Sequence, residues 1–589
     1  MPHPRDAHSA SLIEKICTVN VQTSEPFDAI VVGSGMSGGW AAKELCEKGL
    51  KTLVLERGRS VEHGTDYITE HKAPWEMPFR GRGDRQAVEA RQFRQSKAGP
   101  FNAYTAHWYV DDVDHAYETA PDGDPNEVLW VRGYHLGGRS IMWGRQSYRL
   151  APMDFEANAR EGIGTPWPVA YDEIEPWYSY VERFVGISGE ALGLRQLPDS
   201  EFLPAMALTG PEEHCRDVIA ERFGRTLTIG RAAILTQPHL GRGPCHYCGP
   251  CDRGCTAGAY FSSLSSTLPA AQATGNLTVR SDSIVHSLIY DEEQDRVTGV
   301  RVIDRVTKEA IEFRANLVFL NASALGSTSI LMNTKTPRFP DGLGNQSGLL
   351  GKGIMDHHFK CGAVGDIPGF DDVAPYGNRP NGIYIPRFTN LPWDSSSRRD
   401  FVRGFGYQGG AGRRNGWGRG AGMPGVGVAL KENLQKPGAW QFVMFPFGEM
   451  LAYDDNYMEL TDEVDQWGIP IPRIVGGLKE NELKMREAMI ADGVEMLEAA
   501  GAENIRTFDQ PYRLAEGIHE MGTARMSDSP ETGCVDRWNR VHEIPNLYVT
   551  DGAFMTSAGC QNPSLTYMAF TARAVDHAVE SMKRGELRV

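Results

Sequence analysis

The chain has 589 residues, more than one ordinary hydrophobic core accommodates, so the sequence predicts at least two domain-sized units. Its formal net charge of -16 at pH 7 disfavours nucleic-acid binding, because phosphates repel an acidic surface. No apolar run is long enough to span a bilayer, and residues 1–20 lack the apolar core and cleavage site of a signal peptide.

The first element pattern in the chain is a strand, a helix and a second strand. Residues 27–34 form an apolar, β-branched run, residues 36–48 carry small and apolar side chains at helical spacing, and residues 51–56 predict the second strand. This order and length are typical of a dinucleotide-binding unit. Residues 62–125 show little periodicity and predict long loops.

Three glycines, Gly33, Gly35 and Gly38, form a G-x-G-x-x-G pattern in the turn between the first strand and the helix. The first glycine permits a tight turn, the second lets the backbone approach a pyrophosphate, and the third lets helix and strand pack closely. Glu56, at the end of the second strand, is placed to accept hydrogen bonds from ribose hydroxyls. The pattern predicts a dinucleotide site and leaves NAD and FAD both open.

Four of the ten cysteines lie close together in the sequence: Cys245, Cys248, Cys251 and Cys255. Their spacing is that of a bacterial ferredoxin ligand run, which predicts an iron–sulfur cluster. Thr256 stands where ferredoxins have Pro, so a 3Fe-4S and a 4Fe-4S cluster both stay open. Zinc held by four thiolates is the alternative metal, and structural cysteines without a metal are the third interpretation.

The rest of the chain alternates regular and irregular segments. Residues 277–320 predict a β-meander, and residues 478–500 have the spacing of an amphipathic helix. Residues 362–430 are rich in Gly, Pro, Arg and Asn and predict a long irregular segment, either a lid or a disordered region. A strand at 546–553 and a helix from about 564 to 583 end the pattern.

Several motifs occur in the order known from one enzyme family. They are HLGGRSIMWG at 135–144, LVFLNASALGSTSILMN at 317–333, WGIPIPRI at 467–474, HEMGTARM at 519–526 and NLYVTDGAFMTSAGCQNPSLT at 546–566. With the glycine pattern, this set resembles the glucose–methanol–choline (GMC) oxidoreductase family. The resemblance implies that the bound dinucleotide is FAD.

The resemblance also implies an α/β fold, α+β overall, with two interleaved domains. A discontinuous, Rossmann-like FAD-binding domain would comprise residues 24–165, 255–355 and 510–589. A mixed-sheet substrate domain would comprise residues 166–254, which include the cysteine cluster loop, and residues 356–509.

Site residues follow from the same resemblance. His519 matches the first catalytic position of the family, and Asn562 matches the second. An imidazole suits the removal of a hydroxyl proton because its pKa lies near neutrality, while Asn562 would orient the substrate oxygen and the flavin would take the hydride. Gly137, Gly138 and Asp551 would contact FAD together with the glycine pattern and Glu56.

Two departures from the family pattern bear on the cofactor site. Some relatives attach FAD through a histidine in the glycine-loop region, but residues 140–144 read SIMWG, so we expect noncovalent FAD. Ser323 stands in a strand-to-helix turn where the family often has glycine.

The cysteine cluster resembles that of family members acting on sugars and glycosides, the glucoside 3-dehydrogenases among them. We therefore expect a dehydrogenase that oxidises a secondary ring hydroxyl, with the 3-position favoured, and passes electrons through the cluster to a cytochrome c or similar acceptor. The resemblance implies a small export or chaperone-like partner subunit and a periplasmic location by co-export, or a cytoplasmic one if the chain is alone. An oxidase using O2 and a non-catalytic, redox-sensing flavoprotein stay open as alternatives.

Overall fold

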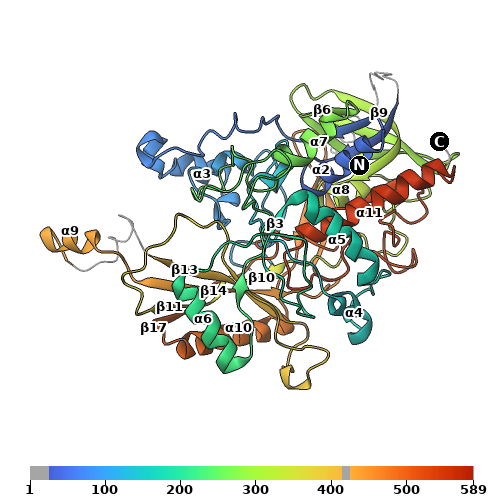
Figure 1. The fold of residues 1–589 in the computed structure, drawn as a ribbon. Coiled ribbons are helices and arrows are strands. Elements are labelled where there is room, and N and C mark those ends of the chain that lie inside the picture. Colours follow the sequence, from blue (N-terminus) through green and yellow to red (C-terminus); the bar gives the residue numbers. More distant parts are fainter. Residues whose placement is uncertain (1–25, 414–424, 588–589) are drawn as a thin grey trace, which may run out of the picture.

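The computed structural model describes residues 26–413 and 425–587. The predicted absence of a signal peptide in residues 1–20 lies outside this range, as does part of the predicted irregular segment 362–430. Two sheets dominate the structure, and in Figure 1 the first lies above the second. None of the described helices combines the length and apolar character that a membrane crossing requires.

The first sheet is built around parallel strands. Its parallel members are β1 (Phe27–Val32), β2 (Thr52–Leu55), β6 (Leu277–Arg280), β9 (Ala310–Leu320) and β18 (Leu547–Val549). The ends of β1 and β9 that pair with each other are almost fully buried, which explains their continuous apolar sequences. The predicted strand–helix–strand unit is therefore present at the start of the described chain.

An antiparallel extension continues this sheet. Strand β7 (Ser283–Asp291) pairs with β8 (Arg296–Asp304), and β8 pairs with the first half of β9. The predicted meander over 277–320 is therefore correct for β7 to β9. Strand β6 differs, because it pairs in parallel with β2 on the other side of the sheet.

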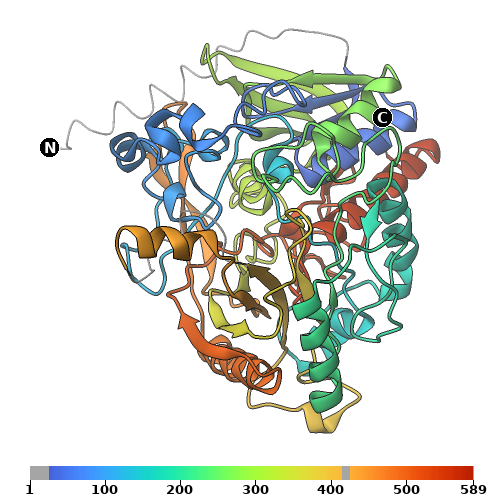
Figure 2. The same ribbon diagram turned by 60° about the vertical axis from the view of Figure 1, so that its left-hand side comes forward.

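Helices cover the first sheet. Helix α2 (Met36–Glu47) packs against α11 (Ser564–Lys583), and α11 also packs against α5 (Tyr171–Val185), as Figures 1 and 2 show. The predicted C-terminal helix has the bounds expected from the sequence. Other described elements are α3 (Arg85–Arg91), α4 (Pro152–Glu161), α6 (Gly210–Phe223), α7 (Leu268–Ala273), α8 (Ala324–Met332), α9 (Val428–Gln435), β3 (Ile187–Ser188), β4 (Phe202–Leu203), β15 (Tyr457–Val464) and β16 (Pro470–Val475).

The second sheet is antiparallel in every pairing found among the described residues, rather than mixed as predicted. Its strands are β5 (Thr228–Ile229), β10 (His357–His358), β11 (Cys361–Ile367), β12 (Ile383–Ile385), β13 (Phe405–Arg413), β14 (Trp440–Glu449) and β17 (Glu503–Asp509). The predicted α/β class with a Rossmann-like sheet and a second, substrate-side sheet is confirmed. The exact domain limits stay a prediction.

The prediction that residues 362–430 are irregular was wrong for three stretches of the segment, because β11, β12 and β13 belong to the second sheet. Its glycines serve close strand pairing. At Gly409, with φ of +142°, an added Cβ would lie 1.9 Å from the carbonyl oxygen of Val443 on β14. The glycine at this position therefore allows two strand backbones to approach each other closely.

The two faces of the second sheet have different neighbours. Helix α10 (Glu480–Ala499), the predicted amphipathic helix, packs against one face, where it meets Phe405 and Tyr407 of β13. Because side chains alternate along a strand, Gln408 points to the opposite face. Phe447 of β14 lies on that opposite face too, since Phe442 and Met444 belong to the α10 side. This second face lines the cavity described below.

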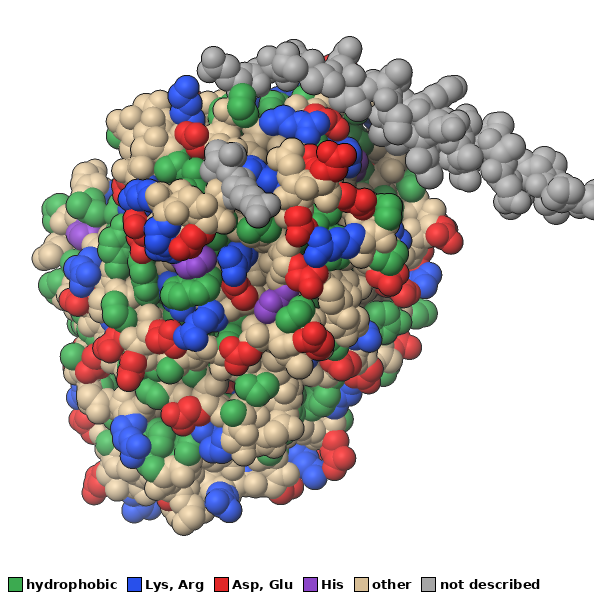
Figure 3. Space-filling model, turned by 90° about the vertical axis from the view of Figure 1, so that its right-hand side faces the viewer, with side chains coloured by type: hydrophobic (Ala, Val, Ile, Leu, Met, Phe, Trp, Pro, Cys, Tyr) green, Lys and Arg blue, Asp and Glu red, His purple; other side chains and the backbone are tan. Residues whose placement is uncertain are grey.

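Ser323, the predicted departure from the family pattern, adopts φ of +70° immediately before helix α8. This backbone region favours glycine, so the serine is strained where the family often has glycine. On the face shown in Figure 3, acidic and basic side chains are interspersed, and no large basic area of the kind that binds nucleic acid is seen there.

Candidate active site

A cavity of about 670 Å³ is lined by residues from both sheets. Gly33, Gly35 and Glu56 line one part of it, near the ends of β1 and β2. His519 and Asn562 line another part, together with Gln408 of the second sheet. The cavity therefore brings the predicted dinucleotide site and the predicted catalytic residues into one space.

Each of the three glycines of the turn is favoured at its position for a different reason. At Gly33, with φ of +97°, an added Cβ would lie 2.3 Å from the carbonyl oxygen of Asn321. At Gly38 an added Cβ would lie 2.1 Å from the carbonyl oxygen of Gly33. At Gly35 the space is open, and no side chain caps the first turn of α2. The uncapped N–H groups beside an open glycine fit the pyrophosphate of a dinucleotide.

Glu56 is held in place by two donors. Ser34 Oγ donates to Glu56 Oε2 at 2.5 Å, and the backbone N–H of Gly58 donates to Glu56 Oε1 at 2.8 Å. Burial raises the pKa of Glu56. Ser34 Oγ also accepts a hydrogen bond from the backbone N–H of Gly137 at 2.9 Å, so one serine joins the glycine turn to the 135–144 loop.

The other predicted cofactor contacts border the same cavity. Gly138 lies against Gly35, since an added Cβ at Gly138 would come within 3.3 Å of its Cα. Asp551 accepts from Ser327 Oγ at 2.5 Å and from the backbone N–H of Ala553 at 3.1 Å. Burial raises the pKa of Asp551 to about 6. Gly137 is not among the described residues that line the cavity, and it contacts the site through its N–H bond to Ser34.

The structure brings His519 and Asn562 together. Asn562 Nδ2 lies 3.4 Å from His519 Nε2, and Asn562 Oδ1 accepts a hydrogen bond from Gln408 Nε2 at 2.6 Å. On the other side of the imidazole, His519 Nδ1 lies 3.0 Å from His357 Nδ1. His357 Nε2 in turn lies 2.8 Å from the carbonyl oxygen of Gly559. One continuous polar chain thus runs through the two predicted catalytic residues.

His519 is neutral near pH 7 in this environment. Burial lowers its pKa well below the usual value, and the nearby His357 and Arg139 lower the pKa further. Burial also lowers the pKa of His357 to about 4. A neutral imidazole is the form that can accept a proton.

Asp356 positions the backbone around both histidines. Its carboxylate accepts from the backbone N–H of His357 at 2.8 Å and from that of His519 at 3.1 Å. It also accepts from the backbone N–H of Gly517 at 2.8 Å and from the hydroxyl of Tyr512. These bonds tie the loop before His519 to the start of the second sheet.

Arg139 links the 135–144 loop to the segment that carries His519. Its guanidinium forms two hydrogen bonds with the carboxylate of Glu520, at 2.9 Å and 2.7 Å. Because planar guanidinium and carboxylate groups match in a paired geometry, this contact fixes the orientation of the Arg139 and Glu520 side chains as well as their separation. Arg139 lines the cavity, and Glu520 directly follows His519 in the chain.

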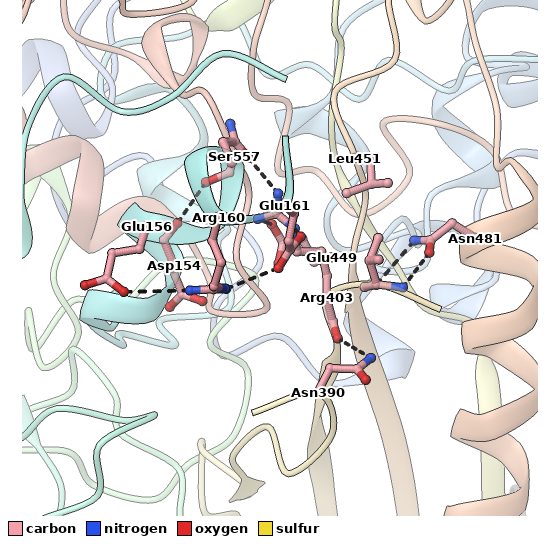
Figure 4. A network of polar contacts seen from close by, with 12 residues as sticks. Asp154, Glu156, Arg160, Glu161, Asn390, Arg403, Glu449, Leu451, Asn481 and Ser557 are labelled. Carbon is pink, nitrogen blue, oxygen red and sulfur yellow. Dashed lines mark hydrogen bonds and ion pairs between the residues drawn. The ribbon is translucent and has the colours of Figure 1, made fainter. Parts of the chain in front are cut away.

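A buried polar network holds the segment before α11 (Figure 4). On α4, Asp154 accepts from Gln561 Nε2 at 3.1 Å, and its backbone carbonyl accepts from Ser557 Oγ at 3.4 Å. Arg403, next to β13, forms ion pairs with Glu161 of α4 at 2.7 Å and with Glu449 of β14 at 3.3 Å. Helix α4 therefore connects the second sheet to the segment that carries Gly559 and Asn562.

The four clustered cysteines lie in one loop beside the cavity. Cys248 is exposed, whereas Cys245, Cys251 and Cys255 are half-buried around Tyr260. Asp252 of this loop lines the cavity. In the described residues, no group of three or more His, Cys, Asp or Glu side chains is placed to hold a metal ion, so the described conformation does not present the predicted ligand set.

Sequence reasoning missed several polar neighbours of the predicted site. Ser34 lies between two glycines of the motif, and this position was a weak local indication that its side chain contacts the cofactor site. His357, Asp356 and Gln408 come from segments that only the three-dimensional fold brings to His519 and Asn562. Asp356 directly precedes β10 and His357 begins that strand, and no periodicity in the sequence marks the pair.

Comparison with known proteins supports the same architecture. GMC oxidoreductase models match residues 27–359 and 452–571. The 2-methyl-1,2-propanediol dehydrogenase of Mycolicibacterium austroafricanum is 26% identical over 94% of this chain and 95% of that protein. The fructose dehydrogenase large subunit of Gluconobacter japonicus is 24% identical over 95% and 98%, respectively. The solved structure of an Aspergillus oryzae formate oxidase variant, with 15% identity, covers 96% of this chain and 100% of its own at a TM-score of 0.62.

The first family match alone spans more than half of the chain, and it contains the glycine turn and Glu56. The second contains His519 and Asn562. The chain therefore belongs to the GMC oxidoreductase family, and it is an FAD-dependent oxidoreductase that acts on CH–OH groups.

Proposed function

We propose that the chain is a dehydrogenase that oxidises a secondary ring hydroxyl of a sugar or glycoside, with the 3-position favoured. The observation that carries the proposal is the contact between neutral His519 and Asn562 at the wall of the cavity. A fructose dehydrogenase subunit and a diol dehydrogenase among the relatives support a polyhydroxylated substrate. The resemblance to glucoside 3-dehydrogenases supports the ring position.

The two residues have complementary roles in this proposal. A hydroxyl oxygen that faces both residues from the cavity donates its proton to His519 Nε2 and accepts a hydrogen bond from Asn562 Nδ2. These two nitrogens lie 3.4 Å apart, so one oxygen in front of the pair can lie within hydrogen-bond distance of both. FAD bound in the cavity supplies the hydride acceptor.

The cofactor contacts predicted from the sequence are compatible with the cavity. The residues that would hold FAD, here proposed to be noncovalent, are Gly33, Gly35, Gly38, Glu56, Gly137, Gly138 and Asp551. The uncapped start of α2 would meet the pyrophosphate, and the Glu56 carboxylate would meet a ribose.

We also propose an iron–sulfur cluster, either 3Fe-4S or 4Fe-4S, on Cys245, Cys248, Cys251 and Cys255. The cysteine spacing and the place of Asp252 in the cavity wall support it. The described conformation does not gather the ligands, so the loop would have to close around the metal. Zinc and unmetallated thiols are the competing interpretations.

A cytochrome c or similar acceptor and a small export or chaperone-like subunit complete the proposal, with a periplasmic location by co-export. The name of one relative, a large subunit, supports a multi-subunit assembly. Fractionation of cells that express the chain with and without candidate small subunits tests this part. A periplasmic chain in the absence of any partner would contradict co-export.

The proposed reaction is tested by anaerobic flavin reduction with a set of glycosides. We expect sugars to bleach the flavin and His519→Ala to slow bleaching by about 10² to 10⁴ while FAD content is unchanged, because a general base is lost. Asn562→Ala should also be impaired. His542→Ala is the matched control, since that histidine lies outside the cavity.

Bleaching by primary aliphatic alcohols alone would contradict the sugar assignment. Rapid peroxide formation in air, with no reduction of a cytochrome acceptor, would favour the oxidase. A flavin that no alcohol or sugar bleaches would favour the non-catalytic flavoprotein.

The mode of FAD attachment has a direct test. Acid precipitation should release the yellow chromophore into the supernatant, because no histidine lies in residues 140–144 to form a covalent link. A yellow protein pellet would show covalent attachment.

Metal analysis of anaerobically purified protein tests the cluster. We expect iron and acid-labile sulfide, both lost in Cys248→Ser and Cys251→Ser, while substrate still bleaches the flavin because that half-reaction uses His519. Reduction of a cytochrome acceptor should slow sharply. Cys215→Ser is the control, because this buried cysteine belongs to the core beside the second sheet and lies outside the cysteine loop. Stoichiometric zinc, or undiminished cytochrome reduction in the two cluster variants, would contradict the proposal.

A further inference from the structure

Gln408 links the second sheet to the proposed catalytic residues. It lies on the cavity face of β13, opposite the α10 core, and its Nε2 donates to Asn562 Oδ1 at 2.6 Å. Among the described residues, its other amide atom, Oε1, accepts no hydrogen bond. One side chain thus contacts a proposed catalytic residue and offers a free acceptor to the cavity.

The contact between His357 and the Gly559 carbonyl fixes which atom is the donor in each hydrogen bond that leads to His519. The carbonyl oxygen of Gly559 can only accept, so His357 Nε2 carries the hydrogen in the 2.8 Å contact. His357 is neutral, so its Nδ1 is an acceptor and His519 Nδ1 must carry the hydrogen between them. His519 Nε2 then carries the lone pair, on the side of the imidazole that faces Asn562 and the cavity.

The position of the lone pair on His519 Nε2 also fixes the orientation of the Asn562 and Gln408 amides. Asn562 must present its Nδ2 donor to the lone pair of His519, so Asn562 Oδ1 faces Gln408 and accepts from its Nε2. Turning both amides round would require His519 Nε2 to carry the hydrogen. His357 Nε2 would then be a lone pair facing the Gly559 carbonyl, two acceptors at 2.8 Å. Gln408 Oε1 is therefore the amide atom left for the cavity.

We propose that Gln408 is a positioning and specificity residue that recognises a second hydroxyl group, on a carbon next to the one that is oxidised. The inference rests on the proposed oxidation at His519. Its Nε2 orients Asn562, and its Oε1 accepts from the neighbouring hydroxyl. The substrate class is a vicinal diol or polyol, and Gln408 itself takes part in no covalent step.

The placement of the two amides accounts for the vicinal arrangement. Asn562 and Gln408 are in direct contact, so the donor that meets the reacting oxygen and the acceptor at Oε1 adjoin each other in the cavity wall. Hydroxyls on neighbouring carbons can meet both. A substrate without the second hydroxyl leaves a polar acceptor of the site unpaired, and such sites discriminate strongly against the analogue.

The wall beside His519 fits the rest of a ring substrate. Phe359 and Phe447 both line the cavity, with their rings stacked 5.3 Å apart at an interplanar angle of 3°. The Phe447 ring lies 6.3 Å from the imidazole of His519. The C–H face of a polyol can rest on this apolar wall while its hydroxyl edge faces the amides.

The experiment compares methyl α-D-glucopyranoside with its 2-deoxy and 4-deoxy analogues in anaerobic flavin reduction. The pair trans-cyclohexane-1,2-diol and cyclohexanol extends the comparison beyond sugars. In the wild type, loss of the recognised hydroxyl should lower kcat/KM by roughly tenfold to hundredfold. Gln408→Leu should reduce this ratio to within about threefold of unity, because the acceptor is gone.

Gln408→Glu separates the two roles. It keeps an acceptor for the second hydroxyl but has no donor for Asn562, so the preference should persist while kcat falls. Gln441→Leu is the matched control, because this glutamine lies on the neighbouring strand, bonds to Asp366 at 2.7 Å and does not line the cavity. FAD content and circular dichroism check that each variant folds.

An unchanged preference in Gln408→Leu, with substrate still reducing the flavin, would overturn the role of Gln408 and leave the proposed oxidation intact. Equal use of diol and mono-ol by the wild type would do the same. Failure of every probe to reduce the wild-type flavin would contradict both the proposed function and the inference that rests on it.

Discussion

The contact between the carbonyl oxygen of Gly559 and His357 sets the chemistry of the whole site. A backbone carbonyl can only accept, and at 2.8 Å it obliges the facing nitrogen to carry hydrogen. This hydrogen fixes the positions of the other hydrogens on His357 and His519, and it leaves the lone pair of His519 on Nε2. A proton acceptor is therefore built by geometry, and burial keeps it uncharged.

Many contacts hold the carbonyl group of Gly559 in place. Gly559 adopts φ of +63° in the segment before α11, and an added Cβ there would lie 2.7 Å from Leu150. Helix α4 binds this segment through Asp154, and Arg403 ties α4 to the second sheet. Asp356 fixes the backbone of both histidines. The site thus depends on two sheets that meet, and neither sheet carries it alone.

Local patterns predicted the parts of the structure that are local. The strand–helix–strand unit, α10 and α11 follow from apolar periodicity, and Gly33 and Glu56 follow from their places within that unit. His519 and Asn562 could be paired only through family resemblance. Gln408 could not be found because it lies 154 residues from Asn562 in sequence, on a strand whose glycines suggested irregular structure. The cysteine spacing predicted a metal site that the described conformation does not assemble.

The pH dependence of anaerobic flavin reduction at saturating substrate tests the central claim, a neutral His519 that accepts the hydroxyl proton. The pKa of His519 lies well below its usual value of 6.5, so the base is already unprotonated at neutral pH. The rate constant should stay level from about pH 7 to about pH 8.5 and fall only on acidification below that range, with the fall abolished in His519→Ala. A rate constant that climbs steadily between pH 7 and about pH 8.5 in the wild type would contradict the account.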